Sequence, residues 1–181
     1  MQNLAVFEPL IEFGTLATPP CPCGYYTDPS KECTCAPPQI QKYMARISGP
    51  LLDRIDIHIE VPAVKYKEIS SETKGETSTE IRERVIRARK IQYERFAHLK
   101  NVFTNGDMGS KEVRQYCKID SAGSDLLKMA MTKLGLSARA YDRILKVSRT
   151  IADLDSSDNI LPQHISEAIQ YRSLDRELWK H

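Results

Sequence analysis

The sequence predicts a mainly α-helical protein in which a small helical bundle follows one helix and one β-strand, with an irregular cysteine-rich segment in front of them. Apolar side chains recur at helical spacing through much of residues 77–175, with short connections between the periodic stretches. Residues 55–61 instead alternate apolar and polar side chains with a period of two, as a half-buried strand does. Residues 1–36 hold five of the ten prolines, which limits regular structure there.

Size and composition are those of an ordinary soluble domain. The 181 residues are 41% hydrophobic and 28% charged. A net charge of +2 and an isoelectric point near 8.2 are too mild to indicate a nucleic-acid binder by themselves. No apolar run approaches the roughly 18 residues of a membrane span, and the first residues lack the pattern of a signal peptide. We therefore expect a cytoplasmic protein with no membrane partner.

The segment 1–36 carries four of the five cysteines, Cys21, Cys23, Cys33 and Cys35. Four thiolates satisfy tetrahedral zinc, and nine residues between the two pairs leave room for a loop. Cys-x-Cys pairs are less usual than Cys-x-x-Cys pairs, so four free thiols remain the alternative to a structural zinc. We expect loops here, with one short element near residues 4–11.

Residues 37–65 form a helix-to-strand unit. Two prolines at 37 and 38 suit a helix start, and apolar residues continue at helical spacing to Ile47 before Gly49 and Pro50 end the helix. The strand over 55–61 closes at Pro62. A single strand is not stable without sheet partners, and nothing downstream supplies them. We therefore expect that the sequence is truncated on its N-terminal side.

A polar linker over 66–76 precedes the bundle of residues 77–175. Thr77 and Glu80 match a capping box and predict a helix to about residue 97. The side chains expected to face inward from that helix are Ile81, Val85, Ala88 and Phe96. Its arginines and glutamates alternate, which is more typical of a solvated surface than of a DNA-binding face.

Further start and stop signals divide the rest of the bundle. Ser110, Asp120 and Ser137 are each suited to cap the start of a helix. Gly135 suits the end of the helix that begins after Asp120. Pro162 suits the first turn of the last helix.

The sequence contains no Gly-x-x-x-x-Gly-Lys-Ser/Thr phosphate loop, and it contains no metalloprotease motif, serine-nucleophile elbow or dinucleotide-binding glycine pattern. Without a phosphate loop the 181 residues have no evident means of holding nucleotide phosphates alone. These absences argue against a self-contained enzyme.

Residues 48–56 place Arg54 where a turn gives way to the predicted strand. A guanidinium held there has the geometry to meet a phosphate, while a salt bridge to Asp53 or Asp56 is the structural alternative. A second arginine, Arg139, stands in the first turn of a predicted helix, where backbone N–H groups favour phosphate, and Arg143 follows one turn later. By spacing alone, both can equally be solvated surface positions.

The runs 48–61 and 134–154 resemble the magnesium-chelatase-like ComM family of AAA+ ATPases, and the resemblance extends over roughly residues 20–175. It implies that Arg54 is an arginine finger reaching a neighbouring subunit's ATP site. It further implies that Arg139 is the sensor-2 arginine of the lid, with Arg143 assisting. Two prolines at 19 and 20 stand where the family has Asn-Pro before its cysteine tract, so no sensor-1 role is transferred.

The resemblance implies the end of an ATPase core over 37–65 and a helical lid over 77–175. The expected activity is ATP- and Mg²⁺-dependent DNA remodelling or branch migration, related to competence, by a homo-oligomeric ring, expected to be a hexamer. The chain alone should neither bind ATP tightly nor hydrolyse it. Two alternatives stay open: a non-catalytic, zinc-holding helical interaction module, and a magnesium-chelatase ATPase subunit.

Overall fold

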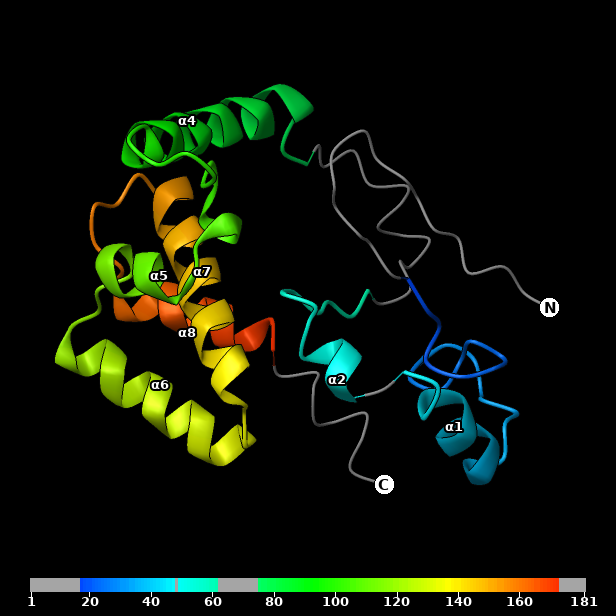
Figure 1. Ribbon diagram of the computed structural model, residues 1–181. Helices are drawn as coiled ribbons and strands as arrows, with labels where there is room; N and C mark the ends of the chain where they lie inside the picture. The colour runs from blue at the N-terminus through cyan, green and yellow to red at the C-terminus, as the bar shows by residue number, and fades with distance from the viewer. Residues whose placement is uncertain (1–16, 48, 62–74, 173–181) are drawn as a thin grey trace. The chain divides into compact units, whose positions relative to one another are not determined.

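The computed structural model describes residues 17–47, 49–61 and 75–172. The chain divides into two compact units, residues 1–48 and residues 49–180, and each is described by itself. Within the described residues the regular elements are helices, drawn in Figure 1, and a single isolated bridge joins Ile119 to Ile160. None of these helices is long and apolar enough to cross a membrane. A mainly helical fold is thus confirmed.

The first unit consists of cysteine-bearing turns followed by helix α1 (Pro37–Met44). The side-chain amide of Gln39 accepts a hydrogen bond from the Ala36 N–H at 3.1 Å and so caps the helix start. Ile40 is the buried apolar residue of this helix. The helix ends at Met44, and turns follow it, with the Ile47 N–H donating to the Met44 carbonyl at 3.0 Å. The prediction that Gly49 and Pro50 end this helix was wrong, because they stand at the start of a short separate helix. The short element predicted near residues 4–11 lies outside the described residues.

The second unit is a helical bundle with helix α7 (Ala138–Leu154) in contact with most of its neighbours. The other elements are α2 (Gly49–Leu52), α4 (Ser78–Phe96), the 3-10 turn η1 (Asn105–Asp107), α5 (Ser110–Tyr116), α6 (Ser121–Leu134) and α8 (Pro162–Gln170). Helix α7 packs against α4, α5, η1 and α8, and α6 packs against α8 (Figure 1). The core between them includes Leu127, Ile144 and Ile165, whose burial is the main stabilising contribution.

Most helix ends follow the sequence signals. The Thr77 hydroxyl accepts from the Glu80 N–H at 3.3 Å, and the Asp120 carboxylate accepts from the Gly123 N–H at 2.7 Å. Gly135 ends α6 in the left-handed region, with a φ of 53°, where a side chain would be strained. Ser110 is the exception: Gly109 caps α5 instead, and its N–H donates to the Glu112 carboxylate at 2.9 Å. The Ser110 hydroxyl is engaged with Asp142, so its capping role was predicted wrongly.

Two residues that were expected to face inward from α4 are exposed. Ile81 and Val85 keep 43% and 42% of their surface in solvent, whereas Ala88 and Phe96 are buried as predicted. Only the C-terminal half of α4 contributes buried residues, so the apolar side chains at its start have no packing partner among the described residues. An amphipathic pattern predicts which face is apolar but not whether a neighbour covers it.

The predicted strand over 55–61 does not form. These residues show no ladder hydrogen bonds, and Ile59 and Val61 are 68% and 83% exposed. The His58 N–H donates to the Tyr171 carbonyl at 2.9 Å just after α8. This stretch therefore contacts the bundle through isolated hydrogen bonds and not through a ladder of them. A strand needs a neighbouring strand to pair with, and the described residues supply none. The polar linker predicted over 66–76 lies largely outside the described residues.

Candidate functional site

The four clustered cysteines converge on one point in the first unit. The Cys21 Sγ lies 3.3 Å from the Cys23 Sγ and 3.7 Å from the Cys33 Sγ. The Sγ atoms of Cys23 and Cys33 are 3.6 Å apart. All four thiol sulfurs, including that of Cys35, lie within 4.8 Å of one another, and all four cysteines are free thiols. Four sulfurs at about 2.3 Å from one zinc ion are separated by about 3.8 Å, so this arrangement fits a tetrahedral Cys₄ site.

Short turns bring these thiols together. The Gly24 N–H donates to the Cys21 carbonyl at 3.0 Å and closes a turn that contains Pro22 and Cys23. Gly24 has a φ of 86°, which favours glycine and lets the chain reverse directly after the first cysteine pair. The first Cys-x-Cys pair therefore lies on a tight turn, and the chain then returns to bring the second pair to the same centre.

Proton binding by the thiols is strongly unequal. The backbone N–H of Tyr25 lowers the pKa of Cys23 to about 5, so one thiolate is stable at neutral pH. The Cys35 N–H acts to lower the pKa of Cys33, but burial and the neighbouring sulfurs of Cys23 and Cys21 outweigh it and raise that pKa to about 12. Burial likewise raises the pKa of Cys35. Without a cation, the raised pKa values of Cys33 and Cys35 therefore keep these two thiols protonated at neutral pH, while Cys23 is ionised.

Arg54 lies in the turn that follows α2, with its N–H bonded to the Leu51 carbonyl at 2.9 Å. Its side chain is exposed and forms no hydrogen bond or ion pair with the residues that the structure describes. The neighbouring carboxylates are engaged elsewhere: Asp56 pairs with Arg143, and Asp53 lies 3.8 Å from the Arg172 guanidinium. The salt bridge considered from sequence is therefore not made by Arg54.

Arg139 and Arg143 differ although they stand one turn apart on α7. Arg139 is exposed in the first turn, beside the cap in which the Ser137 hydroxyl accepts from the Ala140 N–H at 3.2 Å. Arg143 is partly buried and donates to the Asp56 carboxylate. Among the described residues no contact joins Arg139 to Arg54, and Arg143 meets the segment after Arg54 instead.

A buried charge network in the bundle was not anticipated from the sequence. The Asp153 carboxylate, with a side chain that is 0% exposed, accepts from Arg95 at 2.5 and 2.7 Å, from Asn105 at 2.8 Å and from Arg149 at 3.1 Å. Arg149 also donates to the carbonyls of Ser157 and Asp158 at 2.5 and 2.8 Å. Burial lowers the pKa of Arg149. The (i, i+4) spacing of Arg149 and Asp153 on α7 was the available signal.

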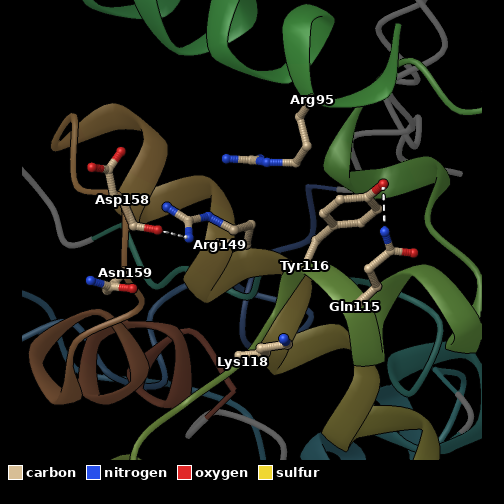
Figure 2. A pocket seen from close by; sticks show the side chains of 7 residues that line it. All are labelled: Arg95, Gln115, Tyr116, Lys118, Arg149, Asp158 and Asn159. Atoms are coloured by element: carbon tan, nitrogen blue, oxygen red, sulfur yellow. Dashed lines mark hydrogen bonds between the residues drawn. The ribbon is translucent and has the colours of Figure 1, made fainter. Parts of the chain in front are cut away.

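This network forms part of the wall of a cavity of about 250 Å³. Figure 2 shows the Arg95 and Arg149 guanidinium groups on one side of the cavity and the Tyr116 ring, bonded through its hydroxyl to Gln115, on the other. The remaining lining residues are Lys118, Asp158 and Asn159. Both arginines donate to Asp153, and Arg149 also donates to backbone carbonyls, so their charges serve the fold rather than an incoming anion.

Comparison with known proteins shows which families the sequence matches. Residues 75–172 match the model "Magnesium chelatase, subunit ChlI C-terminal", and residues 11–69 match "Magnesium chelatase, subunit ChlI". The chain is 43% identical over 162 residues to the competence protein ComM of Haemophilus influenzae, covering 89% of this chain and 30% of the relative. It is 42% identical over 160 residues to the uncharacterized protein YifB of Escherichia coli, covering 88% and 30%. The chain thus spans about 30% of the length of these curated relatives.

Proposed function

The chain belongs to the magnesium chelatase ChlI family of AAA+ ATPases, and from that premise we propose that its residues supply an arginine finger and a nucleotide-sensing lid. In this proposal residues 37–65 are the end of the ATPase core and residues 77–175 the lid, joined by a linker over 66–76. Arg54 enters the ATP site of the next subunit in a ring. Arg139 contacts phosphate in its own subunit.

The observation that carries the proposal is the exposure of Arg54 between two occupied carboxylates. Asp53 and Asp56 are the natural partners of this arginine, yet they face Arg172 and Arg143. Arg54 is thereby left as a cation on a backbone turn, available to a group outside the described residues. A finger arginine stabilises the charge that develops on the transferred phosphoryl group and contributes about 10³-fold or more to the rate.

In this proposal ATP and Mg²⁺ are held by a phosphate loop, which this sequence does not contain. These 181 residues act on the nucleotide with charged side chains, Arg54 in trans and Arg139 in cis. In the resemblance to the family, Arg143 assists Arg139. We expect the chain alone neither to bind ATP tightly nor to hydrolyse it.

The name of one relative, a competence protein, supports DNA as the substrate of the assembled ATPase. We propose that the complete subunits form a homo-oligomeric ring, a hexamer, that remodels DNA or drives branch migration. A central ring channel would hold the strand, and the lid would couple nucleotide state to ring movement. A magnesium-chelatase activity is the alternative within the family.

The test of the finger is Arg54→Ala in the complete subunit. We expect ATP hydrolysis to fall about 10³-fold or more, while binding of a non-hydrolysable ATP analogue stays within a few-fold of the parent. Arg114→Ala is the matched control, because Arg114 is also an exposed arginine and lies on α5. Loss of nucleotide binding together with hydrolysis in Arg54→Ala would contradict the finger role.

We also propose a structural zinc ion held by Cys21, Cys23, Cys33 and Cys35. The support is the convergence of four free thiols at separations that fit tetrahedral coordination. Zinc would link the two Cys-x-Cys pairs and stabilise all four thiolates at neutral pH. Reduced thiols accord with a cytoplasmic location.

Elemental analysis of purified protein tests this site. We expect about one zinc per chain, reduced severalfold by Cys23→Ser and retained in Cys117→Ser, whose thiol is buried in the bundle. A zinc-free protein whose thermal unfolding is unchanged by a strong chelator would show that the cysteines are simply free thiols.

The thiol cluster also favours a second candidate function, a zinc-holding interaction module without catalysis. In that case Arg54 would have no role at an ATP site, and Arg54→Ala would leave ATP hydrolysis by the complete subunit unchanged. The hydrolysis measurement therefore separates the two candidates.

A further inference from the structure

The segment that carries Arg54 is fastened to the bundle on both sides of that residue. Before it, the Asp53 carboxylate lies 3.8 Å from the Arg172 guanidinium. After it, the Ile55 carbonyl accepts from Arg172, and Asp56 accepts from Arg143. Further along, the His58 N–H donates to the Tyr171 carbonyl at 2.9 Å. We name this set of contacts the finger latch.

Two arginines form the bundle side of the finger latch. Arg172, just beyond α8, is 1% exposed, so its position is set by the surrounding fold. Arg143 projects from the second turn of α7 and remains partly exposed with Asp56. The residues that they hold lie directly before and after Arg54, whose own side chain stays in solvent. A flexible turn held at both ends presents its side chain in a narrower range of positions.

We propose that Arg143 and Arg172 are positioning residues for Arg54, acting through Asp56, Asp53 and the Ile55 carbonyl. This inference rests on the proposed function, because it assumes that Arg54 reaches a neighbouring ATP site. It assigns Arg143 to the turn that carries the finger and leaves phosphate contact to Arg139.

The placement of these groups makes α7 a link between two ATP sites. Arg139 stands in its first turn and Arg143 one turn later, so both move with the same helix. A shift of α7 caused by nucleotide contact at Arg139 displaces the anchor of Asp56, and with it the finger that this subunit extends into the neighbour's ATP site. Hydrolysis at one site thereby depends on the nucleotide state of the adjacent site.

The direct test replaces charges in the complete ATPase subunit. Asp56→Asn removes the anion and changes little else, and we expect kcat for ATP to fall about 10- to 100-fold while KM stays within threefold. Arg143→Asp should cause a comparable loss of kcat. The exchanged pair, Asp56→Arg with Arg143→Asp, should recover kcat to within about fivefold of the parent because the attraction is restored.

Glu76→Gln is the matched control, since Glu76 forms a part-exposed ion pair with Arg84 at the start of α4, away from the latch. We expect it to leave kcat and KM unchanged. Matching circular dichroism spectra and thermal transitions of the 181-residue parent and Asp56→Asn chains exclude misfolding, as expected for a part-exposed pair.

The outcomes separate the latch from the proposed function. If Arg54→Ala abolishes hydrolysis but Asp56→Asn keeps full kcat, the latch is refuted and the finger stands. If Arg143→Asp instead weakens ATP binding and the exchanged pair does not recover kcat, Arg143 contacts phosphate and the positioning role is refuted. If Arg54→Ala hydrolyses ATP normally, the proposed function itself fails.

Discussion

The second unit contains two groups of arginines whose charges are compensated in opposite ways. In one, Arg95 and Arg149 converge on buried Asp153, and their donors are directed to acceptors inside the fold. In the other, Arg54 and Arg139 are exposed and form no ion pair within the described part of the chain. Buried cations need compensation because desolvation is costly, whereas exposed ones are held at little cost.

The difference teaches which arginines to assign to function. Sequence position does not separate the two groups, since Arg139 and Arg149 lie on the same helix. Their partners do. A cation satisfied inside the fold should matter for stability, and a cation left in solvent should matter for an external anion. Replacing members of each group should therefore change different measurements.

The largest effect on stability is expected for Asp153→Ala. Removing this carboxylate leaves two arginines of the network without their shared partner, so we expect the free energy of unfolding to fall by about 3–5 kcal/mol. Urea unfolding of the chain measures it. Asp125→Ala, at an exposed position on α6, is the control and should change stability by less than about 0.5 kcal/mol. A loss below 1 kcal/mol for Asp153→Ala would mean that the network is incidental to the fold.

Arg149→Met should come second. The substitution keeps much of the side-chain length but removes the bonds to the Ser157 and Asp158 carbonyls, while Arg95 still neutralises Asp153. We expect a loss of about 2–3 kcal/mol from the unpaired carbonyls, measured by the same urea titration. A stability equal to that of the parent would mean that the bonds of Arg149 do no more than offset the free energy of burying its charge.

Thr77→Ala should cost about 1 kcal/mol, because it removes the cap of α4. The Thr77 N–H and, after it, the Thr77 hydroxyl lower the pKa of the partner Glu80 below the usual 4.5, and the substitution removes the hydroxyl. The contribution of this carboxylate is therefore present above pH 4.5 and is lost as the pH falls through its lowered pKa. Thermal unfolding at pH 7 and near pH 3 measures both effects. An equal difference between Thr77→Ala and the parent at the two pH values would contradict the role of Glu80.

Arg139→Ala should have the smallest effect on stability, within about 0.5 kcal/mol, because its side chain is exposed. In the complete subunit the same change should weaken ATP binding or hydrolysis by about tenfold or more, as loss of a charge-assisted phosphate contact does. Urea unfolding and a nucleotide titration measure the two quantities. A destabilised protein with normal nucleotide binding would move Arg139 into the structural group.

Several helix boundaries of the bundle were predictable because their causes are local. Asp120, Gly135, Ser137 and Pro162 all act within one turn of the residues they cap or begin, and the sequence displays those turns directly. The spacing of the four cysteines allowed their convergence but did not decide it, because nine residues separate the two pairs. Fold class followed from these signals together.

The features that the sequence did not indicate depend on contacts between distant residues. Arg95 and Asp153 lie 58 positions apart in the sequence, which hides their pairing, and Asp56 lies 87 positions from Arg143. The strand over 55–61 was predicted from alternation, but a strand exists only with a partner. The same limit applies to Ile81 and Val85, whose helical pattern was read correctly while the cover of that face was not.

The central claim is that Arg54 works in trans, and mixing subunits tests it most directly. One complete subunit carries Arg54→Ala with an intact phosphate loop, and the other carries a disabled phosphate loop with Arg54 intact. Each alone should be inactive, and mixed rings should recover a substantial share of ATP hydrolysis, because some interfaces pair an intact loop with an intact finger. Mixed rings that form but stay inactive, or rings of Arg54→Ala alone that hydrolyse ATP at the parent rate, would contradict the claim.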